Sequence, residues 1–291
     1  MQQRPQTIQI FLPAGDPRGM RVAEITTRII RVIEVPRSEL SEFLKMPEAK
    51  QVAVYFLVGE LSEAGLPRVY IGQSGSVGYR LAQHNQGKDF WNRAFVVISL
   101  TNSMTQTHSL FLEWFAINAA AKAERYQLEN GNSGAKPYTP APLEADCHEI
   151  HETAATLLAT LGQPIFEPLT NAPSALSVKE LFYCKGSGAD GVGEYTTEGF
   201  VVHKGSRGRA EMVNSFNDTS GHRLRSKLLA ENVLSLQGDA LVLNHDYLFP
   251  TPSSASDVLT GRNSNGWIEW KDAKGKTLDE LKRQTVTSLT Q

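Results

Sequence analysis

The run from Val52 to Val58 limits the possible folds of this chain more than any other segment, because it is apolar throughout and has the length of a strand. A strand without alternation of apolar and polar residues should bury both of its faces. A polar stretch from Gly59 to Pro67 follows, and the extended pattern resumes from Arg68 to Ile71. These segments therefore predict two paired strands joined by a loop.

The segments that follow have alternately helical and extended patterns. A short helix is predicted from Val77 to Gln86, a strand from Arg93 to Leu100, and a long helix, rich in alanine, from Thr107 to Arg125. Amphipathic spacing predicts a further helix from Leu143 to Leu161. The order of these elements predicts an α+β fold, in which helices flank a small antiparallel sheet.

The length of 291 residues suits two or three domains, and the patterns indicate where they divide. Alternation around a turn predicts a hairpin near the N-terminus, followed by a third strand and a short helix. We predict a β-rich N-terminal extension over residues 1–50 and a domain over residues 51–162. A linker over residues 163–180 and a β-rich segment with a small α+β C-terminal domain over residues 181–291 complete the chain.

The bulk composition excludes a disordered chain but leaves the choice of partner open. Charged residues make up 21% and apolar residues 41%, as in globular proteins, and the net charge of −2 argues neither for nor against nucleic acid. Cys147 and Cys184 lack metal-ligand spacing and are expected to be free thiols. No apolar run has the ~20 residues of a membrane span, and the N-terminus lacks the apolar core of a signal peptide. We therefore expect a cytoplasmic protein that does not contact a membrane.

Glu113 is the acidic residue whose position most needs an explanation. It shares a face of the predicted long helix with Leu110 and Ile117, where a carboxylate is costly unless it is paired, protonated or bound to metal. Cleavage of a phosphodiester needs a group that accepts a proton from water and cations that neutralise the developing charge. Glu113 is therefore a candidate metal ligand; a salt bridge or a partly exposed position is the alternative.

Arg80 and His84 are four residues apart and share one face of the predicted short helix. They suit a phosphate clamp, and a solvated helix face is the alternative. Tyr55 and Tyr70 fall on the two paired strands, where tyrosine is common for reasons of packing alone. None of these four residues specifies an activity by itself.

The joint arrangement resembles the GIY-YIG nuclease family over residues 52–132. The second signature, Tyr70-Ile71-Gly72, is intact, and the first reads Ala53-Val54-Tyr55 with its tyrosine kept. Arg80 lies eight residues after this glycine. His84 and Glu113, the latter inside an apolar helix, follow in the family's order. The family's closing asparagine is best matched by Asn130, with Asn132 as the alternative. The catalytic residues that the resemblance implies are Tyr55, Tyr70, Arg80, His84, Glu113 and Asn130.

The resemblance implies hydrolysis of DNA phosphodiester bonds with a single Mg²⁺ or Mn²⁺ ion. Glu113 would bind the cation, Arg80 would pair with the scissile phosphate, and Tyr55 would take the proton of the attacking water. Tyr70 would position the water or share the proton. Because an ordinary tyrosine has a pKa near ~10, two routes stay open. Either Arg80 and the metal-bound phosphate favour the ionised tyrosine, or the proton passes on to His84.

Two further patterns resemble a dinucleotide-binding motif and a metal site. Residues 186–191 match the dinucleotide fingerprint letter for letter, but Val192 to Thr197 do not predict the helix that must follow it. We expect a hairpin loop there and no nucleotide cofactor. Cys147 lies on the apolar face of its predicted helix, whereas His148 and Glu152 share the polar face. A solvated helix surface is therefore expected, and not a metal site.

The most basic stretch of the chain lies between Val201 and Lys227. It suits a phosphate backbone, and a solvated loop and helix are the alternative. Further along, a serine-rich helix start and a glycine precede Asn265-Gly266-Trp267. This pattern resembles a C-terminal domain of unknown function that often follows GIY-YIG domains, over about residues 220–285, and modules attached to restriction-type adenine methylases. The predicted nucleic-acid-binding residues are Lys204, Arg207, Arg209, Arg223, Arg225 and Lys227.

These patterns together predict a DNA endonuclease with a targeting domain at its C-terminus. The rival hypothesis is a regulatory DNA-binding protein that has kept a nuclease fold and lost its activity, as the altered first signature allows. RNA stays open as a substrate, because nothing in the sequence indicates whether a 2′-hydroxyl is recognised. Trp267 and Trp270 are expected to build a small core, and not to stack on bases.

Overall fold

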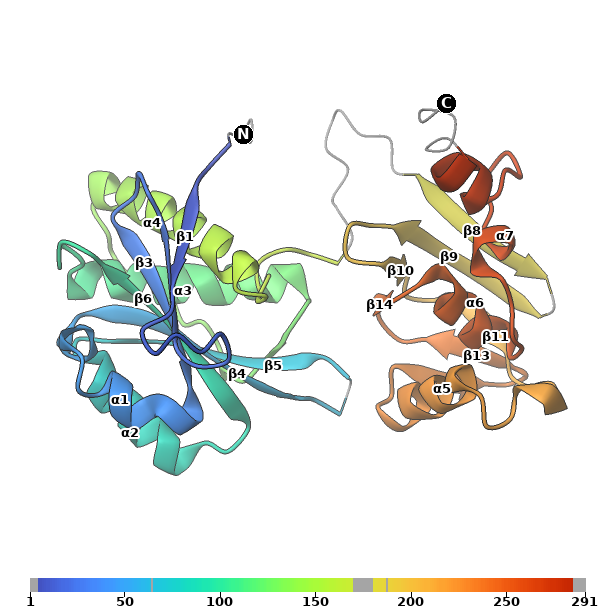
Figure 1. Ribbon diagram of the computed structural model, residues 1–291, viewed down its shortest axis with the longest axis horizontal. Coiled ribbons are helices and arrows are strands. Elements are labelled where there is room, and N and C mark those ends of the chain that lie inside the picture. Colours follow the sequence, from blue (N-terminus) through green and yellow to red (C-terminus); the bar gives the residue numbers. More distant parts are fainter. Residues whose placement is uncertain (1–4, 64, 170–179, 187, 285–291) are drawn as a thin grey trace. The chain divides into compact units, whose positions relative to one another are not determined.

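The computed structural model describes residues 5–63, 65–169, 180–186 and 188–284. The chain divides into two compact units, one of Met1–Ser62 with Leu66–Pro168 and the other of Glu63–Gly65 with Leu169–Gln291 (Figure 1). Each unit has its own sheet, helices and apolar core, so the fold is α+β in both. Residues 170–179 of the predicted linker lie outside the described residues.

The described residues of the first unit form a sheet with the strand order β1-β2-β3-β6-β4-β5-β7. Neighbouring strands are antiparallel, except that the short β7 runs parallel to β5. The predicted buried strand is β4, whose residues 53–58 are buried between β5 and β6. The strands are β1 (Ile8–Phe11), β2 (Arg21–Ile25), β3 (Ile30–Pro36), β4 (Ala53–Leu61), β5 (Pro67–Ser74), β6 (Trp91–Ser99) and β7 (Gln127–Leu128).

The N-terminal strands belong to this same sheet. Strand β3 pairs with β6 over its whole length, from Ile30 opposite Ser99 to Pro36 opposite Arg93. Its residues are mostly apolar and nearly all buried, since β2 and β6 flank it. The predicted boundary at residue 50 therefore falls between β3 and β4, inside one compact unit.

Helices cover both faces of the sheet (Figure 1). Alternation along β4 directs Val54 and Phe56 into the core that contains α3 and α4. Tyr55 and Leu57 point the opposite way, into the core that contains α1 and α2. In the described part of the chain, none of the helices is long and apolar enough to cross a membrane. The helices of this unit are α1 (Leu40–Phe43), α2 (Val77–Gly87), α3 (Gln106–Ala123) and α4 (Ala141–Thr160).

The long helix α3 has defined caps at both ends. Thr105 and His108 form a capping box at its start, in which the Thr105 backbone N–H donates to His108 Nδ1 over 3.1 Å. At the other end Glu124 adopts a left-handed conformation with φ of 52°, and its N–H donates to the Ala120 carbonyl. These caps fix the position of Glu113, in the middle of the helix, along the sheet.

The described residues of the second unit form a sheet with the order β12-β13-β11-β9-β10-β14, and β8 pairs with β9 outside this path. Its core includes Trp270, which is fully buried and donates its indole N–H to the Pro252 carbonyl over 3.0 Å. Trp270 is therefore a core residue, as predicted. The elements are β8 (Leu181–Gly186), β9 (Ala189–Tyr195), β10 (Phe200–Val202), β11 (Arg207–Arg209), α5 (Ser220–Ala230), β12 (Leu234–Gln237), β13 (Ala240–Leu243), β14 (Tyr247–Phe249), α6 (Pro252–Thr260) and α7 (Gly266–Glu269).

Strand β9 occupies the place where a dinucleotide fingerprint would need a helix. The loop expected over residues 186–191 is shorter than predicted, because Ala189 and the residues after it pair with β8. Glycine is uncommon in strands, but at Gly191 and Gly193 other residues pack closely against the backbone. A Cβ on Gly191 would lie 2.5 Å from Leu259, and one on Gly193 would lie 2.6 Å from the Val201 carbonyl. Tertiary packing therefore explains both glycines.

Candidate active site

Three aromatic side chains from three elements meet on the α2 side of the first sheet. The ring centroids of Tyr55 and Tyr70 are 6.3 Å apart, and the His84 ring lies 5.6 Å and 5.0 Å from them. The Tyr55 hydroxyl and His84 Nε2 are 2.8 Å apart, within hydrogen-bond distance. Burial lowers the pKa of His84 to about 4, and the charges of Arg80 and Lys88 add to this shift. His84 is therefore neutral near pH ~7, and its Nε2 accepts a hydrogen bond from the Tyr55 hydroxyl when Nδ1 carries the ring hydrogen.

Gly72 leaves the space that the Tyr55 side chain occupies. The two residues lie opposite each other in the register of β4 and β5. A Cβ on Gly72 would lie 2.3 Å from the Tyr55 hydroxyl oxygen and 2.4 Å from its Cζ atom, closer than real contacts allow. Only glycine at this position therefore lets the tyrosine ring lie over β5 and reach His84.

Arg80 is the cation next to the two tyrosines. It is half-buried on α2, and the predicted sharing of a helix face with His84 brings both side chains to the tyrosines. The Tyr55 hydroxyl raises the pKa of Arg80, and Tyr70 adds to this effect. Burial raises the pKa of Tyr55, whereas the Arg80 guanidinium acts in the opposite direction. Arg80 therefore stays charged and available to an anion at this site.

Glu113 approaches the same group of residues from α3. Its half-buried carboxylate accepts a hydrogen bond from the backbone N–H of Gln73, near the end of β5. Burial raises the pKa of Glu113, while the Gln73 N–H and the Arg80 charge lower it. Its charge in turn raises the pKa of Tyr55. Among the described residues Glu113 forms no ion pair, so its carboxylate is not neutralised by a salt bridge.

Asn130 supports the strand that carries Tyr70. Its side-chain oxygen accepts a hydrogen bond from the Ile71 N–H over 2.9 Å, and its amide nitrogen donates to the Ile71 carbonyl over 2.7 Å. Asn132, the alternative, is exposed, and among the described residues it has no such contact with β5. Asn130 therefore acts on the site through the backbone of Ile71, between Tyr70 and the glycine, and not through a free side chain.

Lys88 is a residue of this cluster that the sequence analysis missed. Its ammonium group lies 4.3 Å from the centroid of the Tyr70 ring, which is a cation–π arrangement. Lys88 directly follows α2, and its backbone N–H donates to the His84 carbonyl over 3.0 Å, which holds it close to His84. Lys88 gives the cluster a second cation beside Tyr70.

The cluster suits a cation that keeps most of its water ligands. In the described residues, no group of three or more His, Cys, Asp or Glu side chains is arranged to hold a metal ion. Mg²⁺ is commonly bound by one or two carboxylates together with waters and substrate phosphates. The half-buried, unneutralised carboxylate of Glu113 fits this mode of binding. A zinc site, which needs three or four protein ligands, does not fit.

Arg225, one of the predicted nucleic-acid-binding residues, is structural. It is 2% exposed, and its guanidinium donates to the carbonyls of Arg209 over 2.5 Å, Ala210 over 2.6 Å and Val258 over 3.2 Å. Burial lowers its pKa to about 10. Arg225 shares the buried face of α5 with Leu228, which explains why it points inward. We therefore remove it from the predicted nucleic-acid-binding set.

The other predicted basic residues reach the surface from β11, α5 and the loop before β11. Arg223 and Lys227 share the outer face of α5, because they are four residues apart. Lys227 lies 3.7 Å from Glu231, so part of its charge is balanced. Arg209 is half-buried, and the others are exposed. This surface set is Lys204, Arg207, Arg209, Arg223 and Lys227.

Replacing Arg225 by methionine is expected to destabilise the second unit by about 1–3 kcal/mol, because backbone carbonyls would lose their donor in a buried environment. The matched control is Arg223→Met on the exposed face of the same helix, where a change within about 0.5 kcal/mol is expected. Chemical denaturation of both variants measures the difference. Equal losses of stability in the two variants would contradict the structural role of Arg225.

The side chains of Cys147 and His151 pack against apolar and aromatic residues of the first unit. Cys147 is fully buried in the core that contains α3 and α4. The centroid of the His151 ring lies 4.7 Å from that of Phe115 and 4.4 Å from that of Phe166. Burial lowers the pKa of His151 to about 4. This half-buried histidine is therefore neutral at neutral pH in the folded chain, as His84 is.

The stability of the first unit is expected to fall as the pH is lowered from about 6.5 to about 4. His84 and His151 have pKa values of about 4 in the folded state, below their ordinary value of 6.5, so the unfolded chain binds more protons in this range. The stabilisation is fully present above pH 6.5 and is lost as the pH falls through about 4. Thermal unfolding followed by circular dichroism measures this trend.

The variant His151→Leu is the control for the pH dependence, because leucine keeps an apolar side chain against Phe115 and Phe166 but cannot bind a proton. The melting temperature of this variant should depend less steeply on pH than that of the wild type. An unchanged slope would show that His151 does not contribute.

Comparison with known proteins gives one family match, which covers most of the second unit. Residues 182–282 match the family model described as Domain of unknown function (DUF4357). The match includes most of β8 and all of β9 to α7, so it begins well before residue 220, where the sequence pattern places the start. No curated protein matches the chain, and no solved structure does.

Proposed function

We propose that the chain is a metal-dependent endonuclease that hydrolyses DNA phosphodiester bonds, and that its first unit is a GIY-YIG-type nuclease domain. The observation that carries the proposal is the meeting of Tyr55, Tyr70, Arg80 and His84 from β4, β5 and α2 with Glu113 from α3. Together these groups supply a carboxylate for a hard cation, a permanent positive charge and phenolic oxygens. Phosphodiester hydrolysis needs these three kinds of group.

In the proposed reaction, the oxygen of a water molecule bonds to phosphorus and the bond from phosphorus to the leaving oxygen breaks. Arg80 pairs with the scissile phosphate, for which the planar guanidinium is well suited. Glu113 would hold Mg²⁺ or Mn²⁺, which when bound would supply positive charge that stabilises the transition state. Asn130 is a positioning residue, since it fixes the backbone of β5 at Ile71.

Tyr70 is better placed than Tyr55 to contact the attacking water. Tyr55 is fully buried, and this burial raises its pKa and disfavours the ionised form. Tyr70 is only half-buried, and Lys88 lies beside its ring. We therefore propose that the phenolate form of Tyr70 takes the proton of the water and becomes the neutral phenol, while the leaving oxygen takes a proton from solvent. Tyr55, bonded to His84, would be a positioning residue, although the sequence pattern favours it as the base.

The second unit is proposed to hold the DNA. Its surface carries five basic side chains at β11, α5 and the loop before β11, and such groups neutralise backbone phosphates without reading sequence. The proposed contacts are Lys204, Arg207, Arg209, Arg223 and Lys227.

The rival function, regulatory DNA binding without cleavage, is favoured by one observation. Tyr55, the tyrosine of the altered first signature, has no exposed surface. If catalysis required this hydroxyl to contact water directly, the folded chain would be inactive. The two functions differ in a single measurable property, the cleavage of a phosphodiester bond.

Incubation of the full chain with covalently closed circular DNA tests the proposal, because one cut converts the circle to a relaxed form that gels resolve. Nicking is expected with Mg²⁺ or Mn²⁺ and not with excess chelator. The same reactions with single-stranded RNA test the substrate class. Cleavage of RNA alone would contradict the DNA substrate, and DNA binding without cleavage under all conditions would establish the rival function.

A further inference from the structure

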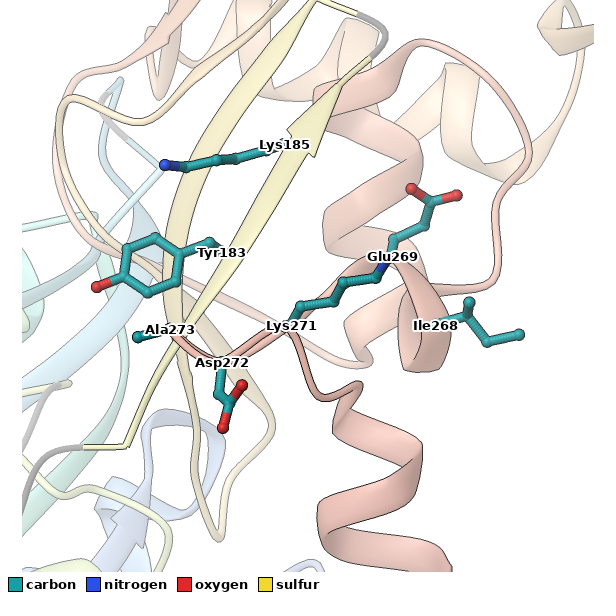
Figure 2. Close-up of a pocket in the computed structure, with 8 residues that line it drawn as sticks. Tyr183, Lys185, Ile268, Glu269, Lys271, Asp272 and Ala273 are labelled. Carbon is teal, nitrogen blue, oxygen red and sulfur yellow. The ribbon is translucent and has the colours of Figure 1, made fainter.

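A pocket of about 610 Å³ lies in the second unit (Figure 2). Its volume falls in the range that holds a small ligand or one unit of a polymer. Figure 1 shows β8, which forms one wall, and α5, which carries part of the basic surface, at opposite ends of this unit. The pocket is therefore separate from the basic residues of α5. Its lining includes Tyr183, Lys185, Ile268, Glu269, Lys271 and Asp272.

One wall of the pocket combines an aromatic ring with a cation. Phe182 and Cys184 of β8 are buried in the core, so the alternating residues Tyr183 and Lys185 point outward. Figure 2 shows their side chains extending from β8 in the same direction. The Lys185 ammonium lies 5.4 Å from the centroid of the Tyr183 ring. Backbone hydrogen bonds in both directions with Lys271, of 2.7 Å and 3.0 Å, fix the position of Tyr183.

Positive charges outnumber negative ones at the pocket, because Arg262 pairs with Glu269 and leaves Lys185 and Lys271 against the single carboxylate of Asp272. Glu269 accepts a hydrogen bond from Arg262 over 2.7 Å, which balances its charge. Asp272 accepts two backbone N–H groups of its own turn, over 2.9 Å and 2.8 Å. In contrast, Lys185 and Lys271 form no ion pair within the part of the chain that the structure describes. Lys185 lies beside the Tyr183 ring, and Figure 2 shows Lys271 on the side of the pocket where Glu269 lies.

We propose that this pocket binds a nucleotide unit of a single-stranded nucleic acid, with the base stacked on Tyr183 and the neighbouring phosphates paired with Lys185 and Lys271. Aromatic faces combined with lysines along the backbone are the general means of binding single strands without sequence preference. A duplex does not expose the faces of its bases, and an acidic peptide has no planar group for the tyrosine. The site lies in the second unit and does not depend on the cleavage proposed for the first.

Fluorescence anisotropy of a labelled ten-nucleotide thymidine strand tests the site, with the full chain and with chelator present to prevent cleavage. Tyr183→Leu is expected to weaken binding about tenfold, whereas Tyr183→Phe keeps the ring and should bind normally. Replacing both Lys185 and Lys271 by glutamine should reduce the slope of log affinity against log salt by about 1.4, or about 0.7 for each phosphate contact. Lys274→Gln, an exposed lysine of the same turn that does not line the pocket, should leave the slope unchanged.

Unchanged binding by Tyr183→Leu, or an equal effect of Lys274→Gln, would overturn the proposal. Thymidine monophosphate distinguishes the source of the ligand, because equal affinity for it would identify a free nucleotide and contradict the binding of a strand. A loss of duplex binding by Tyr183→Leu as large as its loss of strand binding would also contradict it. The Tyr183→Phe variant and the melting temperature of each protein separate loss of binding from loss of folding.

Discussion

Glu113→Gln is expected to reduce Mg²⁺-dependent nicking of DNA at least about a hundredfold, which is the scale of losing one group that stabilises charge in a transition state. Glutamine keeps the size of the side chain and can still accept the Gln73 N–H through its carbonyl oxygen. It lacks the negative charge with which a carboxylate binds a hard cation. The loss should therefore fall on metal-dependent chemistry and leave the helix α3 intact.

The stability of Glu113→Gln provides a second readout in the same protein. Burial raises the pKa of Glu113, which means that the surroundings disfavour its charge. An uncharged amide of the same shape should therefore fold at least as stably as the wild type. The expected result is lower activity together with an equal or higher melting temperature. If unfolding caused the lower activity, the melting temperature would fall.

The matched control is Glu152→Gln, which removes an exposed carboxylate from α4 in the same unit. Its nicking rate and its dependence on Mg²⁺ concentration should equal those of the wild type. Equal cleavage by Glu113→Gln and the wild type would remove Glu113 from the site.

Most of the first unit could be predicted from the sequence, because its elements have strong periodic patterns. The apolar run at β4, the long helix α3 and the helix α4 all appear close to their predicted positions. The spacing of Arg80 and His84 on one turn of α2 likewise follows from helix geometry. Local patterns therefore predicted which side chains share a face.

The contacts of buried polar side chains could not be predicted, because they depend on partners that are distant in the sequence. The sequence indicates that Arg225 is a surface cation, whereas in the structure it is buried and donates to the carbonyls of Arg209 and Val258. The apolar run predicts that Tyr55 is buried, but a strand with two buried faces does not reveal which face carries a site. Its hydroxyl finds His84 only through the pairing of β4 with β5 and the packing of α2.

Gly72→Ala is expected to destabilise the first unit by about 1–3 kcal/mol, the usual cost of forcing an extra carbon into a packed core. The new Cβ would lie 2.3 Å from the hydroxyl oxygen of Tyr55, which is fully buried and has no space to move into without displacing its neighbours. Moving the ring would also break its hydrogen bond to His84. The melting temperature should therefore fall by several degrees, and nicking should be lost with it.

Two comparisons show whether the Tyr55 side chain causes this loss. Gly87→Ala, at the end of α2, is the control: a Cβ there meets nothing within 4 Å, so the change should be neutral or stabilising. In the background of Tyr55→Leu, which removes the ring, Gly72→Ala should cost at least about 1 kcal/mol less than in the wild type, as expected for residues in contact. Additive effects of the two substitutions would mean that the glycine is needed for some other reason. Nicking should stay absent in the double variant. The variant can regain stability, but without Tyr55 it has no hydrogen bond between β4 and His84.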